Sequence, residues 1–196
     1  SDVCSSDLKL NVPRIGVRFR LPASMNQVEY FGRGPAENYL DRNAGSMIGL
    51  YKSTAEELYF PYVRPQENGH HTDTRWVSLS TGKKGLLIQA DNTIGFNALR
   101  NSIEDFDDEE ATGLPRQWSN FTPEQVANHD EAAAKSVLRR QHHINDITPR
   151  DFVEVCVDLK QQGVAGYDSW GSRPEPAYTL PANREYNWGF TLIPLK

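Results

Sequence analysis

The sequence predicts a mainly β protein in which antiparallel strands form a β-sandwich, with one short helix on its surface. Apolar and polar residues alternate within several short segments, which is typical of strands with one buried face. Gly, Pro and Asn residues separate these segments and favour turns between them. The chain has no regular alternation of strands with helices, so a parallel sheet with crossover helices is not expected.

The first predicted strand follows a polar leader at residues 1–9, which has no apolar periodicity and is interpreted as a non-native or boundary segment. Ile15, Val17, Phe19 and Leu21 then fall on one face of a strand, with arginines on the other face. Residues 80–85 predict a turn between two strands. The further predicted strands span residues 28–31, 76–79, 86–90, 153–159 and 190–193.

One helix is predicted over residues 122–140. Thr122 can cap its first turn, Pro123 suits the first helical position, and Gln125 completes a capping box. Its apolar stripe is thin, which favours a place on the surface. The acidic run at residues 104–110 precedes the helix and is interpreted as a solvated loop rather than a metal site.

Composition excludes several classes of partner. The 196 residues carry a net charge of −5, which does not favour nucleic acid or an anionic membrane surface. No apolar run approaches the roughly 20 residues that cross a bilayer, and the N-terminus resembles no export signal. Cys4 and Cys156 are not expected to form a disulfide, and Cys156 is expected to be a buried thiol within a strand.

Three motifs stand out, and we call them blocks 1 to 3. Block 1 is FGRGPAENYLDR at residues 31–42, block 2 is PYVRPQENG at residues 61–69, and block 3 is GVAGYDSWG at residues 163–171. Block 3 places Trp170 in a glycine-rich loop, where its flat apolar face can stack on a sugar ring. Burial of Trp170 as a plug at the end of the sandwich is the alternative.

The three blocks, in this order, resemble the C-terminal domain of the large β-galactosidases of glycoside hydrolase family 2. The resemblance covers residues 10–196 and is weakest between residues 105 and 140. It implies an antiparallel β-supersandwich similar to galactose mutarotases. The family's domain normally begins earlier, so the first strands of the sandwich are expected to be absent and strand edges to be open.

The resemblance implies a part of a retaining glycosidase that hydrolyses terminal β-D-galactosides such as lactose. The two catalytic glutamates of the family lie in a separate (β/α)₈ barrel, and no segment here resembles it. We therefore expect this chain alone to be inactive, with no catalytic residue of its own. Trp170 matches the family's tryptophan that forms a platform for the sugar beside the galactose, on the aglycone side.

The resemblance also implies what accompanies the chain. The expected partners are a β-galactoside substrate and the barrel domain, in the same polypeptide or in a partner subunit, and the complete enzyme is expected to be oligomeric. No cofactor or metal is expected in this chain, whereas the barrel of the complete enzyme is expected to use Mg and Na. The compartment stays open between cytoplasm and periplasm.

Five residues are expected to support loops rather than to react. Asp168, Ser169 and Gly171 surround Trp170, where short polar side chains commonly bond to nearby backbone. Glu67 and Asn68 form a Pro-x-Glu-Asn-Gly turn whose role is structural or ligand-binding, with structure favoured.

The histidines support a competing hypothesis. His70 with Glu67 could supply the base and acid of an aldose-epimerase-like site, so that the chain would be a stand-alone carbohydrate-binding or epimerase module. Metal ligation is disfavoured because adjacent residues of a strand point to opposite faces. The residues of ligand type are His70, His71, Asp73, His142, His143 and Asp146.

Overall fold

The computed structural model describes residues 11–63, 66–106, 144–168 and 171–196. These residues confirm the mainly β prediction, because they form a seven-stranded antiparallel sheet and no helix beyond short 3₁₀ turns. Leader residues 1–9 and the predicted helix at residues 122–140 lie outside the described residues. The chain divides into two compact units, and the sheet lies in the unit of residues 1–60, 68–100 and 150–196.

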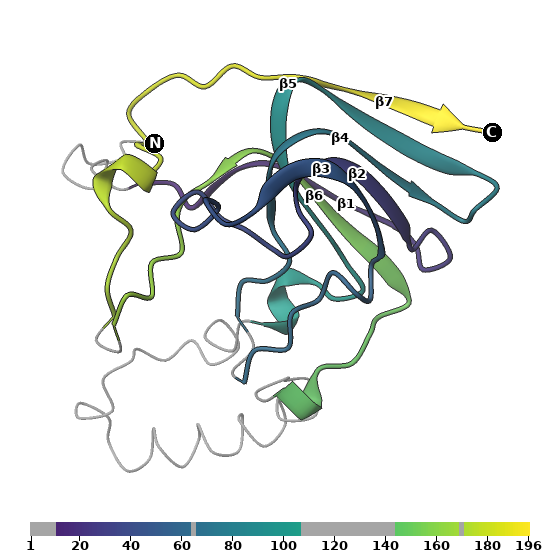
Figure 1. Ribbon diagram of the computed structural model, residues 1–196, viewed down its shortest axis with the longest axis horizontal. Coiled ribbons are helices and arrows are strands. Elements are labelled where there is room, and N and C mark those ends of the chain that lie inside the picture. Colours follow the sequence, from purple (N-terminus) through teal and green to yellow (C-terminus); the bar gives the residue numbers. More distant parts are fainter. Residues whose placement is uncertain (1–10, 64–65, 107–143, 169–170) are drawn as a thin grey trace, which may run out of the picture. The chain divides into compact units, whose positions relative to one another are not determined.

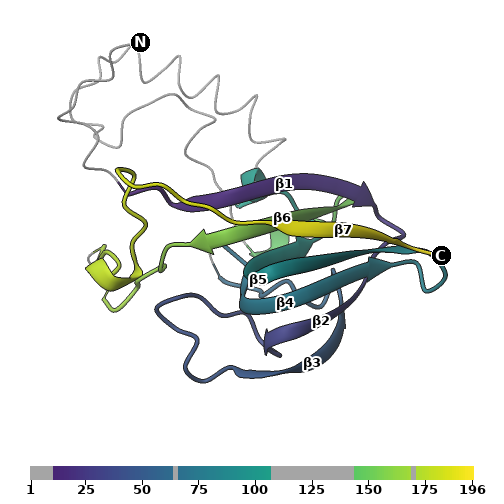
Figure 2. The ribbon, with the colours of Figure 1, turned by 90° about the horizontal axis from the view of Figure 1, so that it is seen from above.

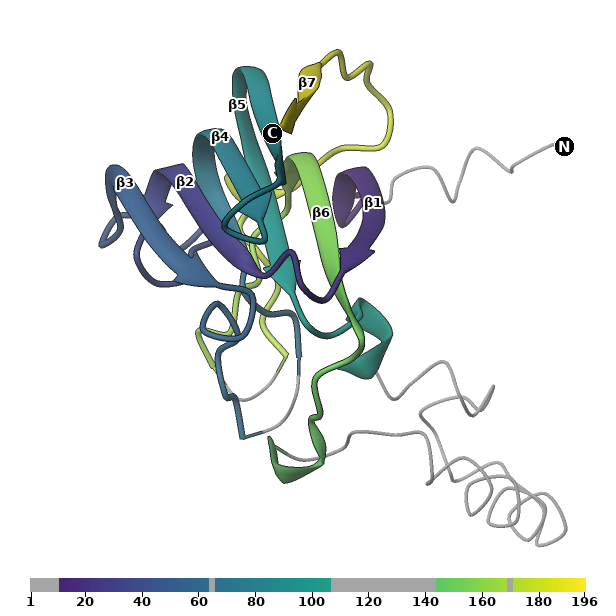
Figure 3. The same ribbon diagram turned by 90° about the vertical axis from the view of Figure 1, so that its right-hand side faces the viewer.

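The sheet has the order β1-β6-β5-β4-β2-β3, and β7 pairs with β5 beside this path. Figure 3 shows β3 and β1 at the two ends of the curved sheet, and Figure 2 shows β7 running beside β5. The bounds are β1 Arg14–Pro22, β2 Gln27–Gly34, β3 Met47–Thr54, β4 His71–Ser80, β5 Gly85–Leu99, β6 Phe152–Gln161 and β7 Phe190–Leu195.

The predicted strands are all present, and the turn at residues 80–85 joins β4 to β5 as expected. The sequence analysis missed β3, which pairs with β2 along its whole length. It also ended the strand at residues 86–90 too early, since β5 continues to Leu99. The first half of β5 pairs with β7 and its second half with β6, so this one strand joins two parts of the sheet (Figure 1).

The core lies on the face of the sheet to which the predicted apolar alternation points. Its fully buried members come from β2, β4, β5 and β6 and include Val28, Tyr30, Val77, Leu79, Ile88, Phe96, Ala98, Val153, Val155 and Val157. β1 contributes less, because it is a terminal strand and Val17 is 44% exposed. Cys156 on β6 is a buried free thiol, as expected; Cys4 lies outside the described residues.

Period-two alternation predicts that β6 has one buried face and one exposed face, but its second face is buried as well. Glu154, Cys156 and Asp158 alternate with the three buried valines, yet they are buried as well. Glu154 forms ion pairs with Arg18 and Arg20 of β1, at 3.6 and 3.1 Å. β6 is therefore buried on both faces, and the Glu154 carboxylate is paired with arginines of the neighbouring strand β1.

The other unit comprises residues 61–67 and 101–149. Its described part contains the 3₁₀ turns η1 Ile103–Asp105 and η3 Ile144–Asp146. The Asp105 carboxylate accepts a 2.9 Å hydrogen bond from the Ser102 N–H, which closes the first of these turns. The Asn101 amide donates to the Thr148 carbonyl at 2.9 Å and ties the two described segments together.

Candidate functional site

Block 1 contacts the other two blocks through its side chains. The Glu37 carboxylate accepts a 2.7 Å hydrogen bond from the N–H of Gly69, the last residue of block 2. Four positions later, the Asp41 carboxylate accepts hydrogen bonds from backbone N–H groups of block 3. Motifs far apart in the sequence thus meet around a single turn-forming segment.

The Asp41 contact fixes the start of the block 3 loop. Its two oxygens accept from the Val164 N–H at 3.2 Å and from the Ala165 N–H at 2.7 Å. Gly163 packs directly against this carboxylate, since an added Cβ would lie 2.5 Å from the Asp41 Cγ and Oδ2 atoms. Ala165 has a φ of 56°, a left-handed conformation that residues with a Cβ rarely adopt. The loop therefore needs both a glycine and an anchoring carboxylate at this point.

The other described residues of the loop, 166–168 and 171, are exposed. Gly166 and Gly171 both have left-handed φ values, of 87° and 83°, and an added Cβ at either would meet nothing within 4 Å. Tyr167 is 57% exposed, and its N–H donates to the Ser172 hydroxyl at 3.1 Å. Asp168 is exposed. Ser169 and Trp170 lie outside the described residues.

Block 2 contains a buried asparagine, Asn68, just before its last residue. The Asn68 side chain accepts from the Phe60 N–H at 2.8 Å and donates to the Phe60 carbonyl at 2.6 Å, so it brackets the backbone of that residue. The Asn68 carbonyl in turn accepts from the Asn97 side chain. Asn68 thus supports the chain at Phe60, and its contacts do not involve block 3. Glu67 is half-buried and lies in the smaller unit.

Asn38 holds block 1 to the start of β4. Its amide donates to the carbonyls of Arg33 and Ala36, both at 3.1 Å. Its Oδ1 accepts from the backbone N–H and the hydroxyl of Thr72, at 2.9 and 2.6 Å. Every polar atom of this buried side chain is used, and block 1 is fixed in place as a result.

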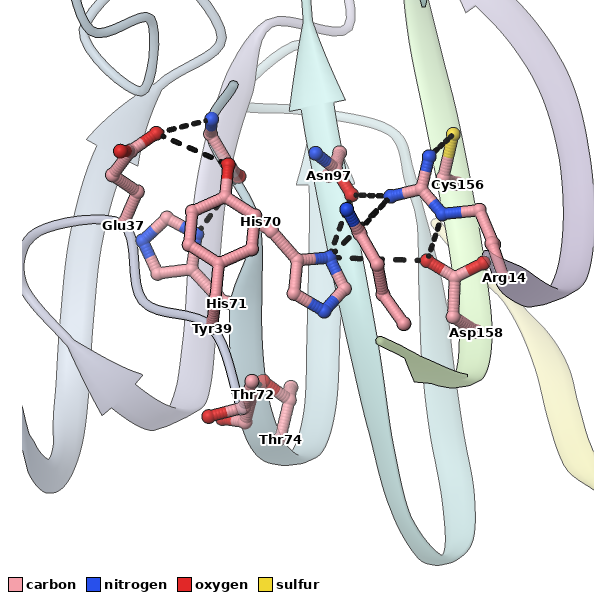
Figure 4. A network of polar contacts seen from close by, with 12 residues as sticks. Arg14, Glu37, Tyr39, His70, His71, Thr72, Thr74, Asn97, Cys156 and Asp158 are labelled. Carbon is pink, nitrogen blue, oxygen red and sulfur yellow. Dashed lines mark hydrogen bonds and ion pairs between the residues drawn. The ribbon is translucent and has the colours of Figure 1, made fainter. Parts of the chain in front are cut away.

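His70 lies at the centre of a buried polar network on one face of the sheet (Figure 4). It is 1% exposed, and its Nδ1 lies 2.8 Å from the Asn97 Oδ1. The Asn97 amide nitrogen already donates to the Asn68 carbonyl, so the Oδ1 must accept and His70 carries its proton on Nδ1. Tyr39 of block 1 stacks on the imidazole, with 5.6 Å between ring centroids.

Arg14 of β1 closes this network from the other side. Its guanidinium donates to the side-chain oxygens of Asn97 and Gln161, both at 2.6 Å, and its Nε lies 3.0 Å from the Asp158 Oδ2. Burial lowers the pKa of His70 from 6.5 to about 3, and the nearby Arg14 charge acts in the same direction. His70 is therefore neutral at physiological pH.

His71 points away from His70 into the apolar core. Its ring lies 5.0 Å from the rings of both Tyr30 and Phe96, and burial lowers its pKa. The neighbouring Asp73 pairs with Arg33. Within the described ranges, no group of three or more His, Cys, Asp and Glu side chains could hold a metal ion. His142 and His143 lie outside the described residues, and nothing is described of the Asp146 side chain.

This arrangement is suited to holding a loop rather than to acid–base chemistry. His70 is too deeply buried to exchange a proton with a sugar, which removes the base of the epimerase hypothesis. Glu37 is committed to the Gly69 N–H and to the Arg42 guanidinium, at 2.7 Å each. The described residues 166–168 of the block 3 loop are exposed.

Sequence analysis missed Arg14, Tyr39, Asn97 and Asp158, and it gave Asp41 no specific partner. A polar residue at a strand position flanked by apolar ones was the available signal for Asn97 and Asp158. That signal becomes specific only with the register, which places Asn97 opposite Cys156 and Gly95 opposite Asp158.

No helix in the described part of the chain is long and apolar enough to span a membrane.

Comparison with known proteins gives consistent matches over nearly the whole chain. The family model for the β-galactosidase small chain matches residues 2–192. A β-galactosidase of Priestia megaterium is 34% identical over 191 residues, which is 97% of this chain and 15% of that protein. A β-galactosidase of Vibrio cholerae is 29% identical over 92% of the chain and 14% of that protein. One from an Arthrobacter species is 40% identical over 107 residues, which is 52% of the chain and 10% of that protein. The chain thus spans about 15% of the length of the first of these relatives.

Proposed function

The chain belongs to the β-galactosidase small-chain family, and we propose that it is the C-terminal part of a β-galactosidase that hydrolyses terminal β-D-galactosides such as lactose. In this proposal the chain shapes the aglycone side of the active site through Trp170. The two catalytic glutamates of the retaining mechanism belong to a (β/α)₈ barrel in the remainder of the enzyme. That remainder has room for such a domain, since the matched relatives are several times longer.

The observation that carries this proposal is the Asp41 anchor at the base of the block 3 loop. A loop fixed at its base and exposed beyond it can present an aromatic side chain to a ligand without losing much conformational entropy on binding. Trp170 stacking on the sugar beside the galactose would position the glucose of lactose, or an acceptor sugar in transfer reactions. The barrel is the proposed place for Mg and Na, and an oligomeric complete enzyme is part of the same proposal.

The test is a chromogenic β-galactoside assay on the purified chain alone and mixed with a fragment that contains the matching barrel. We expect turnover only in the mixture. Trp170→Ala in the mixture should raise the KM for lactose more than the KM for a simple alkyl β-galactoside. Only lactose has a second sugar that would stack on Trp170.

Trp188→Ala is the matched control, since Trp188 packs against Phe190 outside the block 3 loop. This control should handle both substrates as the unmodified chain does. Turnover by the chain alone would place the catalytic carboxylates here and overturn the proposal. Measurable anomer interconversion of free galactose by the chain alone would instead support the stand-alone epimerase.

A further inference from the structure

We infer that Asp41 is a positioning residue of the enzyme: by holding the base of the block 3 loop, it determines how well a sugar is used at the aglycone side. The inference rests on the proposed function of the loop. It concerns a different residue from Trp170, one that lies more than 120 positions earlier and whose carboxylate bonds to the backbone of the loop. Its action is entirely through the backbone of Val164 and Ala165.

The contact has the geometry of a specific anchor. Both carboxylate oxygens of Asp41 are used, each for one backbone N–H of consecutive residues. Hydrogen bonds to an ionised acceptor are shorter and stronger than neutral ones. The bonded segment includes Ala165 in its unfavourable left-handed conformation, which the neighbouring structure must hold. Loss of the carboxylate removes two of the bonds that hold it.

Asp41 can serve as an anchor because its own backbone is fixed. It lies in a tight turn that the Arg42 N–H closes on the Tyr39 carbonyl at 2.9 Å. Tyr39 is buried and stacks on His70, while the Arg42 guanidinium lies 4.8 Å over the Tyr39 ring. The Asn38 N–H bonds to the His70 carbonyl at 2.7 Å. The carboxylate is thus held by the sheet itself.

The loop side of the contact is equally specific. The Gly163 N–H donates to the Tyr178 carbonyl at 2.8 Å, which secures the residue just before the bonded pair. Gly163 leaves no space for a side chain between the loop and Asp41. A methyl group at this position must push the two apart. Gly163→Ala therefore perturbs the same contact from the opposite partner, without touching the carboxylate.

The experiment measures acceptor partition in the complete enzyme that contains this chain, as one polypeptide or as the two-fragment mixture. Galactosyl transfer to glucose is compared with release of galactose to water at one fixed glucose concentration. This ratio does not depend on how much folded enzyme is present, so a purely structural loss of activity leaves it unchanged.

Asp41→Asn keeps the shape of the side chain but turns one acceptor into an NH₂ group that faces a backbone N–H. We expect the transfer ratio to fall about tenfold, the effect of losing one charge-assisted hydrogen bond. Gly163→Ala should lower the ratio in the same direction. Asp73→Asn is the matched control, because it removes a carboxylate that pairs with Arg33 elsewhere on the sheet. Its transfer ratio should equal that of the unmodified enzyme.

The double variant Asp41→Asn/Trp170→Ala separates this inference from the proposed function. If Asp41 acts through the loop, its substitution adds nothing to the transfer ratio once Trp170 is gone. Additive effects, or an unchanged ratio in Asp41→Asn while Trp170→Ala lowers it, overturn the role of Asp41 alone. An unchanged ratio in Trp170→Ala itself overturns the proposed function instead.

A direct structural readout completes the test. Amide hydrogen exchange at Val164 and Ala165 should quicken in Asp41→Asn and stay slow in Asp73→Asn. Unchanged exchange in Asp41→Asn would mean that the carboxylate does not hold the loop, whatever the kinetic outcome.

Discussion

Individual buried polar residues in this domain hold segments of the chain together through hydrogen bonds. His70 is the clearest case, because burial and the Arg14 charge keep its imidazole neutral. Its Nδ1–H is then free to donate to Asn97, which links the end of block 2 to the centre of the sheet. A histidine next to polar residues is easily interpreted as catalytic from the sequence. The burial and hydrogen bonds of His70 indicate a structural role instead.

The pKa of His70 predicts a specific pH dependence of stability. The folded-state pKa is about 3 and the unfolded value is 6.5, so between these values the unfolded chain binds a proton that the folded chain does not. Stability therefore falls as the pH drops from about 6.5 toward 3, by up to about 1.4 kcal/mol per pH unit from this residue. Urea unfolding between pH 4 and 8 measures the effect.

His70→Asn supplies the comparison, because asparagine retains an N–H that can face Asn97 without titrating. The unfolding free energy of this variant should depend less steeply on pH below 6.5 than that of the unmodified chain. His71, whose pKa is also lowered by burial, keeps its share of the slope in both proteins. Identical pH profiles would show that His70 does not resist protonation.

Strands were predictable where the signal is local. The turn at residues 80–85 and the alternating apolar residues of β6 can be recognised from the local sequence alone. β3 was missed because Met47, Ile48 and Leu50 do not alternate cleanly around Gly49, and this strand is defined mainly by its pairing with β2. β5 runs through residues 91–93, Asp-Asn-Thr, which favour a turn locally, and its register with β4 shifts over these residues.

The site was predictable in part for the same reason. Sequence order pointed to blocks 1 to 3, but no local signal shows that Asp41 reaches Val164, 123 positions away. The network around Arg14 likewise combines side chains of three strands whose register is a property of the folded sheet.

β1 is attached to β6 by a buried ion pair, and this makes its stability contribution testable. Arg14→Ala would remove the charge that lies 3.0 Å from the buried Asp158 carboxylate, and breaking a buried ion pair typically costs about 3–5 kcal/mol. Arg20→Ala on the same strand is the control. Arg18 still pairs with Glu154 in that variant, so the loss should be about 1 kcal/mol.

Chemical unfolding of the two arginine variants measures this difference. Partial recovery in Arg14→Met/Asp158→Asn would show that the cost of the single change comes from the charge of the buried Asp158 carboxylate. Equal destabilisation by Arg14→Ala and Arg20→Ala would contradict the assignment of Arg14 as the principal link between β1 and β6.

At the scale of the whole molecule, the described sheet has open ends. Among the strands that the structure describes, β3 pairs only with β2, and it carries the exposed side chains of Met47, Ile48 and Leu50. An apolar edge of this kind can pair with another chain when it is uncovered. We therefore expect the separated chain to self-associate with rising concentration through β3.

Leu50→Lys should weaken this association, because a charged side chain on an edge strand disfavours further pairing. Sedimentation velocity over a concentration series measures it. Val63→Lys introduces the same charge in place of an exposed apolar side chain outside any strand, and it should leave the association unchanged. Equal effects of both lysines would mean that net charge, rather than the β3 edge, governs association.

Because Asp41 bonds to backbone atoms of block 3, the side chains of this loop can vary between members of the family. A carboxylate that recognises two N–H groups is indifferent to the side chains those residues carry. Residues 164 and 167 can therefore be exchanged between homologues, provided that Gly163 and Asp41 are retained and that position 165 carries a residue that tolerates a left-handed φ. Under the proposed function, loop grafts that keep these two positions would vary the acceptor preference of the enzyme, because each graft is bonded to the sheet at the same point.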